Sequence, residues 1–402
     1  MPNVDPLVRN KTGAVGSAIF ALGFRPFFLL AGLFSVLAIS AWSMIYLTGL
    51  TFLPVHLPAI QWHAHAMVFG YAMAVVSGFM LTAVGNWTGI VTLRGWPLAG
   101  LALLWLAARL SLVMPGDLAL VIAATADLLF GAGLLVAIAW PVWRTRQWKQ
   151  LGILSKVFLL VVANATFYAG LFGALDQGVY LGLYGGLYVL LALVFAMGRR
   201  VIPFFIERGV NEAVELRNRG WIDWSSLVLF PVWIVLELFF RAPVWVSLIS
   251  AVLFLIHALR LRDWHTPGIW SQPLLWSLYV GYGFVLLGFA LKAAAPWHPL
   301  AGTLATHAFA YGVVGLVTLG MMARVALGHT GRNVFGPPAA LTPMLALVVV
   351  GALIRVLMPL IWPAQYVIWI GLSQAFWIVA FAGFVWIYAP VCWHPRIDGR
   401  PG

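Results

Sequence analysis

The most regular feature of this sequence is a succession of twelve apolar stretches separated by short polar connections. Each stretch is close to the roughly 20 residues that an α-helix needs to cross a bilayer. The pattern therefore predicts an all-α polytopic membrane protein, with about twelve transmembrane helices in a single transmembrane domain that spans residues 1–402. The stretches cover residues 26–48, 64–84, 96–114, 118–143, 153–173, 179–198, 224–240, 243–260, 273–294, 300–325, 341–361 and 366–389.

Composition supports a membrane protein and argues against a soluble one. Of the 402 residues, 63% are hydrophobic and only 8% are charged, whereas soluble domains carry about 25% charged residues. The net charge of +12 would also suit a protein that binds nucleic acid. In a chain this apolar, cationic loops that orient the protein in the membrane are the simpler explanation. We therefore expect a lipid bilayer, and no nucleic acid, as its partner.

The basic residues outside the helices lie almost entirely on one side of the membrane. When successive loops are assigned to alternate sides, one side receives 19 basic residues, and the other receives only Arg241 and Lys292. Cytoplasmic loops are the ones that carry excess Lys and Arg. The sequence therefore predicts that both termini and the loop 199–221 are cytoplasmic, which places His63 and His65 near the outer face.

Residues 65–109 and 307–355 form an internal repeat. A shift of 242 residues places His65 on His307, and eight of the 25 positions aligned without a gap are identical. The repeat joins the second and third helices to the tenth and eleventh, an offset of eight helices. Such an offset fits three four-helix units around a pseudo-threefold axis.

That arrangement is the architecture of haem-copper oxidases, where histidines of helices 2 and 10 hold a haem between them. The likeness is an analogy of fold alone. It fails at one point, because helices 6 and 7 of this chain carry no histidine. An oxidase-like copper site is therefore not visible.

A histidine within a membrane span is a functional residue by default, because lipid penalises a polar side chain. His63 and His65 are two positions apart, about 200° around a helix, so they cannot face one site unless the helix starts between them. Zinc and copper usually take three or four ligands, whereas haem iron takes two axial ligands. We therefore predict haem b between His65 and His307. The alternative is that both histidines are hydrogen-bonded core residues.

Two arginines also lie inside spans, near the predicted outer ends of their helices. After an insertion of four residues in the repeat, Arg109 falls on Arg355. A guanidinium at that depth is suited to pair with a haem propionate, so both are candidate cofactor-binding residues. Their alternative role is to reach out to the outer interface.

The candidate metal ligands are His63, His65, His307 and His329. His307 and His329 are 22 residues apart, roughly 33 Å along a helix, so they cannot share one metal. The remaining histidines are expected at interfaces or in loops: His257, His265, His298 and His394.

Asp127 lies near mid-membrane and is the most costly of the other polar groups within the spans. We expect it to pair with a neighbouring helix; a proton route is the alternative. The other groups are Asn164, Glu237 and Gln374.

Four segments resemble the signature segments of the NnrS family: "GFRPFFLLAGLFSVLA", "WHAHAMVFGYAMAVVSGFMLTAVGNWTG", "GRRVIPFF" and "THAFAYGVVGLVTLGMMARVALGHTGR". The resemblance runs from about residue 22 to the last span. It implies a bacterial inner-membrane protein of about twelve spans that contains haem and copper. It also implies a role in the response to nitric oxide during denitrification or nitrosative stress.

This chain departs from the family pattern at three positions. Ala66 stands where the family usually has Glu, Gly85 where it commonly has Pro, and Tyr279 where it usually has His. The loss of one acid and one imidazole argues against copper and leaves haem as the expected cofactor.

The sequence leaves several functions open, and it does not decide whether the protein is an enzyme. A haem protein of this family would bind or turn over nitric oxide, or protect cellular iron. A secondary transporter of a small substrate is a different class, suited by the repeat and the intramembrane charges. A non-catalytic haem-based sensor or an assembly factor is the third.

Overall fold

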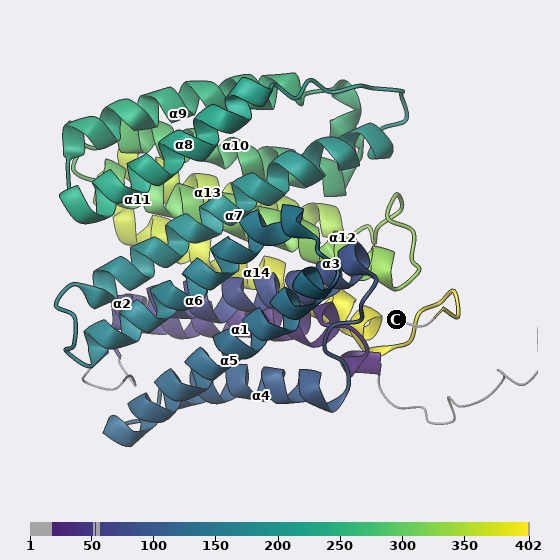
Figure 1. The fold of residues 1–402 in the computed structure, drawn as a ribbon. Coiled ribbons are helices and arrows are strands. Elements are labelled where there is room, and N and C mark those ends of the chain that lie inside the picture. The colour runs from purple at the N-terminus through teal and green to yellow at the C-terminus, as the bar shows by residue number, and fades with distance from the viewer. Residues whose placement is uncertain (1–17, 51–52, 54–56, 401–402) are drawn as a thin grey trace, which may run out of the picture.

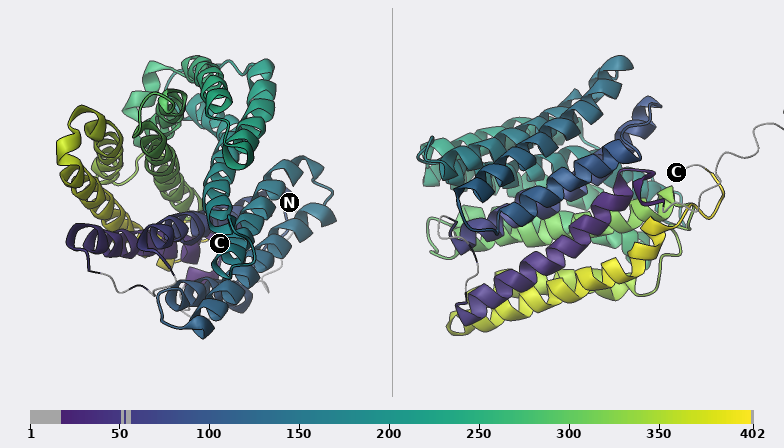
Figure 2. Two further views of the ribbon diagram at one scale, coloured as in Figure 1. Left: turned by 90° about the vertical axis from the view of Figure 1, so that its left-hand side faces the viewer. Right: turned by 90° about the horizontal axis from the view of Figure 1, so that it is seen from below.

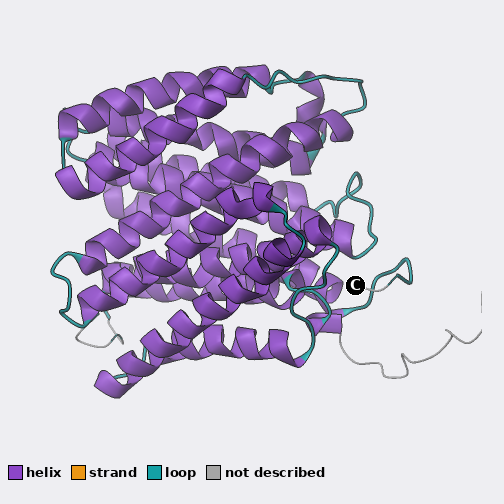
Figure 3. Ribbon diagram, viewed as in Figure 1, coloured by secondary structure: helices purple, strands orange, loops and turns teal. Residues whose placement is uncertain are grey.

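The computed structural model describes residues 18–50, 53 and 57–400, and these form helices joined by short loops (Figure 1). No strand occurs in this part of the chain (Figure 3). The prediction of an all-α polytopic membrane protein is therefore confirmed. Arg9 and Lys11, which contribute to the predicted cytoplasmic charge, lie outside the described residues.

The helices follow the predicted apolar stretches closely. The first half of the chain contains α1 (Phe24–Thr48), α2 (Ala59–His65), η3 (Ala66–Ala72), α3 (Met73–Thr88), α4 (Trp96–Ser111), α5 (Asp117–Arg144), α6 (Leu151–Leu171) and α7 (Gly178–Gly209). The second half contains α8 (Gly220–Val235), η5 (Leu236–Phe240), α9 (Pro243–Asp263), α10 (Pro273–Ala294), α11 (Ala301–His307), η7 (Ala308–Gly315), α12 (Leu316–His329), α13 (Leu341–Ile361) and α14 (Tyr366–Trp393). Short 3₁₀ turns lie at Ala18–Phe20, Trp148–Gln150, Pro267–Ser271 and Pro363–Gln365.

Eleven helices of the described chain are long and apolar enough to cross a membrane, counting α2–η3–α3, α8–η5 and α11–η7–α12 as one helix each. The twelfth, α4, has 16 residues and spans about 24 Å, less than the ~30 Å hydrocarbon core. Conversely, α7 has 32 residues and spans about 48 Å. Residues 199–209 therefore continue α7, and only the second half of the segment 199–221 is a loop.

Helices that follow one another in sequence pack as antiparallel pairs, among them α4 with α5, α6 with α7, α9 with α10 and α13 with α14. The first helix, α1, lies beside the last, α14 (Figure 2). The internal repeat, the single domain and the pseudo-threefold arrangement of three four-helix units stay predictions.

Arg25 ties the start of α1 to the end of α14. Its side chain is fully buried, and NH1 donates hydrogen bonds to the carbonyl oxygens of Cys392 at 2.8 Å and His394 at 2.7 Å. Cations stabilise the carbonyl end of a helix, where these acceptors lack helical partners. Arg25 therefore belongs to the core and not to a solvated loop, and the ends of α1 and α14 lie on the same side of the bundle.

The packing of α6 against α7 depends on glycine. A Cβ atom at Gly182 would lie 2.5 Å from the backbone nitrogen of Phe167 and 2.6 Å from the carbonyl oxygen of Ala163. Small residues at such a contact allow two membrane helices to approach closely. The close approach fixes the face of α6 that carries Asn164, Phe167 and Tyr168.

Candidate functional site

Two helices of the bundle contain a π-helical segment that begins directly after a histidine. In the second spanning helix η3 follows His65, and in the tenth η7 follows His307. The 242-residue offset that aligns the sequences also aligns these two starts. Single π-helical turns are rare and occur frequently at functional sites.

The first group, which we call the carboxylate cluster, consists of His65, Arg109, Asp127, Asn164 and Tyr168. Arg109 NH2 forms an ion pair with Asp127 Oδ2, and the Tyr168 hydroxyl donates to the same oxygen at 3.1 Å. His65 Nε2 lies 3.0 Å from Asn164 Oδ1 and 3.6 Å from Asp127 Oδ2. The five side chains come from α2, α4, α5 and α6, and all are buried. The expectation that Asp127 pairs with a neighbouring helix is confirmed.

His65 is held tightly in this cluster. Because Asn164 Oδ1 can only accept, His65 Nε2 carries the proton and Nδ1 carries the lone pair. That Nδ1 atom is buried without a hydrogen-bond partner. Phe167 stacks on the imidazole with ring centroids 4.2 Å apart, and Phe69 lies at 5.1 Å.

The free space beside the carboxylate cluster is small. A cavity of about 10 Å³ is lined by Asp127, Asn164 and six apolar residues, which is close to the space that one water molecule needs. As packed, the cluster therefore has room for a water molecule and none for a haem macrocycle. Axial ligation of haem by His65 stays a prediction.

The second group, which we call the imidazole cluster, consists of His63, His307, Arg355, Tyr366 and Trp42. Arg355 NH2 donates to His307 Nε2 at 3.1 Å, and the Arg355 side chain also forms a hydrogen bond with the Tyr366 side chain. His63 interacts electrostatically with both His307 and Arg355, and its ring stacks on Trp42 at 4.7 Å. The cluster joins α1, α2, α11, α13 and α14. It lies at the end of the bundle away from the marked C-terminus, where Figure 1 labels α2 and α11.

The hydrogen bonds of His307 define its proton position. Because Arg355 only donates, His307 Nε2 is the acceptor, and Nδ1–H donates to the carbonyl oxygen of Thr303 at 2.9 Å. Two buried atoms of the cluster, His63 Nδ1 and Arg355 NH1, have no hydrogen-bond partner in the described part of the chain. Buried polar atoms are rarely left unpaired, so these two atoms, like His65 Nδ1 in the carboxylate cluster, are available to a further partner.

His329 belongs to neither cluster. Its Nε2 atom lies 3.4 Å from Asn86 Nδ2, and its ring lies 5.9 Å from the ring of Phe24. Phe24 begins α1, so His329 lies at the same end of the bundle as Arg25. That end is opposite the one that carries α2 and α11.

The structure therefore divides the predicted site residues into separate groups. It brings His63 together with His307 and Arg355, and it places His65 with Arg109. No contact within the described residues joins His65 to His307. These residues also contain no group of three or more His, Cys, Asp or Glu side chains arranged to hold a metal ion.

Two tyrosines of these clusters, Tyr168 and Tyr366, were missed by sequence analysis. Tyrosine is common at membrane interfaces, so its presence in a span gives no signal of a site. The histidines and arginines were found because the repeat marks them and because lipid penalises them.

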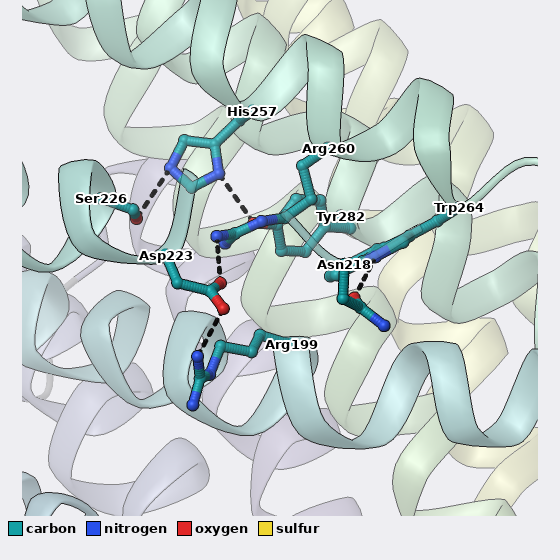
Figure 4. Close-up of polar contacts among 8 residues, drawn as sticks. All are labelled: Arg199, Asn218, Asp223, Ser226, His257, Arg260, Trp264 and Tyr282. Atoms are coloured by element: carbon teal, nitrogen blue, oxygen red, sulfur yellow. Dashed lines mark hydrogen bonds and ion pairs between the residues drawn. The ribbon is translucent and has the colours of Figure 1, made fainter. Parts of the chain in front are cut away.

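A third polar network lies at the end of the bundle opposite α2 and α11. It joins α7, α8, α9 and α10 (Figure 4). Arg260 donates to Asp223 Oδ1 at 2.7 Å and to the Tyr282 hydroxyl at 3.0 Å. The Tyr282 hydroxyl therefore donates to His257 Nδ1 at 2.7 Å, and His257 Nε2–H faces Ser226 Oγ at 3.4 Å.

His257 is fully buried, so the expectation that it is an interfacial or loop residue is wrong. Burial is possible because both ring nitrogens have hydrogen-bond partners, which removes most of the desolvation cost. With no lone pair left free, His257 holds three helices together and is not suited to bind a metal.

These features define a class: a polytopic helical membrane protein with one histidine–arginine cluster buried between its helices and a second, half-buried one at one end of the bundle. A family model described as NnrS protein matches residues 18–396, nearly the whole chain. The chain therefore belongs to the NnrS family, and its membership indicates a role in the nitric oxide response. A search of curated proteins found no match.

Proposed function

We propose that this protein acts in the nitric oxide response as a haem-binding protein of the bacterial inner membrane. The observation that carries the proposal is the imidazole cluster, where α2 and α11 bring His63 and His307 together within the membrane-spanning bundle. The NnrS family is known for binding haem and copper. Neutral imidazoles from two facing helices are the usual axial ligands of a b-type haem.

The donor set of the imidazole cluster fits haem better than copper. His63 Nδ1 and Arg355 NH1 have no hydrogen-bond partner among the described residues, so the first would offer a lone pair to iron and the second would donate a hydrogen bond to a propionate. His307 Nε2 would be available as a second ligand once Arg355 donates to a propionate in place of the imidazole. When bound, haem supplies an iron that can coordinate nitric oxide. A copper site usually needs a third ligand, which the described residues near this cluster do not offer.

In this proposal His65 and Arg109 do not contact the cofactor and have a structural role. Their hydrogen bonds and ion pair are directed to Asp127 and Asn164, and Phe167 covers the imidazole. We assign them to holding α2, α4, α5 and α6 together beneath the cofactor. The alternative is that His65, and not His63, is the haem ligand. Single histidine variants distinguish these two assignments.

Single histidine variants test the ligand assignment. We expect His63→Ala and His307→Ala each to shift or abolish the Soret band, because each removes an axial ligand. We expect His65→Ala to retain haem, with a lower melting temperature. The absorption spectrum and haem content of each purified variant provide the measurement, and His298→Ala, an exposed position on the α10–α11 loop, is the control.

The assignment is contradicted if folded His65→Ala loses haem while His63→Ala keeps a full reduced spectrum. A second candidate function, secondary transport, is favoured by the buried Arg109–Asp127 ion pair, because charged side chains inside the membrane mark substrate and ion pathways. Stable wild-type protein that contains no haem would support transport. Protein that contains haem but does not consume nitric oxide would support a sensor or an assembly factor.

We also propose that the end of the bundle that carries the imidazole cluster faces the periplasm and that both termini are cytoplasmic. The 19 basic residues assigned to one side support this orientation. Alkaline phosphatase fused after Pro296 should therefore be active and, fused after Pro338, inactive, because the enzyme matures only outside the cytoplasm. The opposite pattern of activities would invert the proposed orientation.

A further inference from the structure

Arg355 is a buried cation without a counter-ion in the described chain. Its side chain is 8% exposed, and its partners, His307 and the Tyr366 hydroxyl, are neutral groups. Among the residues that the structure describes, none pairs with NH1. None of the ion pairs within the described residues includes Arg355.

The helices of the imidazole cluster contain no residue that could neutralise Arg355. No Asp or Glu occurs in α1, in the helix from Ala59 to Thr88, in the helix from Ala301 to His329, in α13 or in α14. A charge placed in a low-dielectric interior is strongly unfavourable unless an opposite charge accompanies it. The counter-charge of Arg355 must therefore come from outside these helices.

In the first half of the repeat, residues 65–109, the buried arginine has a counter-ion within the protein. Arg109, which corresponds to Arg355, is paired with Asp127 of α5. Each buried residue of α5 between Leu120 and Ile138, except Ala126, has a buried counterpart 250 positions later in α14. In this register Trp377 takes the place of Asp127, and its indole N–H has no partner.

We propose that Arg355, with His307, His63 and Tyr366, forms a binding site for one anionic oxygen group, either a carboxylate or a small monovalent oxyanion. The anion takes the role that Asp127 has beside Arg109. Arg355 NH1 and the Tyr366 hydroxyl donate to it, which pairs the orphaned NH1 and neutralises the guanidinium. Its source is either a propionate of bound haem, in which case the inference rests on the proposed function, or a free anion such as nitrite.

Anion-dependent stability tests this site on protein freed of haem, so failure of haem binding does not affect the experiment. A ligand that binds only the folded state raises the melting temperature as its concentration increases. We expect nitrite or acetate to raise the melting temperature of haem-free wild-type protein, measured against chloride at equal ionic strength. Arg355→Leu should remove this dependence.

The source of the anion follows from repeating the titration on haem-loaded protein. If nitrite stabilises only the haem-free form, a propionate fills the site. If it stabilises both forms, the site binds a free oxyanion. Equal melting temperatures in nitrite, acetate and chloride for both forms would overturn the proposal.

A matched pair of variants gives an independent test. Tyr366→Glu places a carboxylate beside Arg355, as Asp127 does beside Arg109, and Tyr366→Gln is its neutral control. We expect Tyr366→Glu to melt at a higher temperature than Tyr366→Gln and to be insensitive to added anions, whereas Tyr366→Gln still responds. A Tyr366→Glu protein that is no more stable than Tyr366→Gln would also overturn the proposal.

Discussion

Replacement of Asp127 by Asn is expected to lower the free energy of unfolding by about 3–5 kcal/mol, the usual cost of leaving one member of a buried ion pair unpaired. Asp127 is 1% exposed, and its carboxylate accepts from both Arg109 and Tyr168. The neutral amide keeps the shape of the side chain but removes the counter-ion of Arg109. Unfolding in detergent micelles, followed by circular dichroism, measures the change.

Two further variants control for this interpretation. The double variant Arg109→Met, Asp127→Leu removes both charges and should recover most of the loss, because an apolar pair of similar volume is tolerated in place of a buried ion pair. Asp263→Asn breaks an ion pair with Arg219, whose side chain is 42% exposed, and should cost less than about 1 kcal/mol. A loss of similar size in Asp127→Asn and Asp263→Asn would show that burial does not set the cost.

Replacement of Gly182 by Ala is expected to destabilise the protein by about 1–3 kcal/mol, as overpacking of a tight contact does. The new methyl group would lie within 2.6 Å of backbone atoms of Phe167 and Ala163, so no side-chain rotation can relieve the clash. Moving α6 away from α7 would also shift Phe167 from the imidazole of His65. Thermal unfolding gives the loss of stability, and near-ultraviolet circular dichroism reports the change in aromatic packing.

Gly185 provides the matched control, one turn further along α7. A Cβ atom there would meet Leu238 at 3.8 Å, an ordinary contact. Because alanine favours the helix by up to about 1 kcal/mol over glycine, Gly185→Ala should be neutral or stabilising. Similar melting temperatures for the two variants would contradict the view that backbone contact requires glycine at position 182.

The spanning helices could be predicted from the sequence because length and hydropathy alone specify them in a bilayer. Two helices, α4 and α7, differ in length from the apolar stretches that predict them. Polar residues do not end a helix at the membrane surface, so α7 continues through Arg199 and Arg200 to Gly209.

The site residues were found individually, but their grouping was not. The repeat aligns His65 with His307, and both histidines precede a π-helix. Residues two apart point in nearly opposite directions on a helix. The sequence therefore does not say whether His63 or His65 faces α11, the helix that carries His307. That choice depends on the rotation of α2, which places His63 toward His307 and His65 toward α5 and α6.

Arg25 shows a similar limit. A basic residue at the start of an apolar stretch has the pattern of a loop charge, and the charge count treated it as one. Its burial follows from the position of α14, whose last carbonyl groups approach it from more than 360 positions away in the chain. No local pattern reports a contact of that separation.

The same contact sets an order for the synthesis of the protein. The acceptors of Arg25 belong to the last residues of the final helix, so they emerge from the ribosome only when nearly the whole chain has been made. Until then the Arg25 guanidinium cannot bind the carbonyl groups of Cys392 and His394, and α1 cannot pack against α14. The bundle therefore closes at the end of translation, and a chain truncated before residue 392 inserts without the bond that joins its first helix to its last.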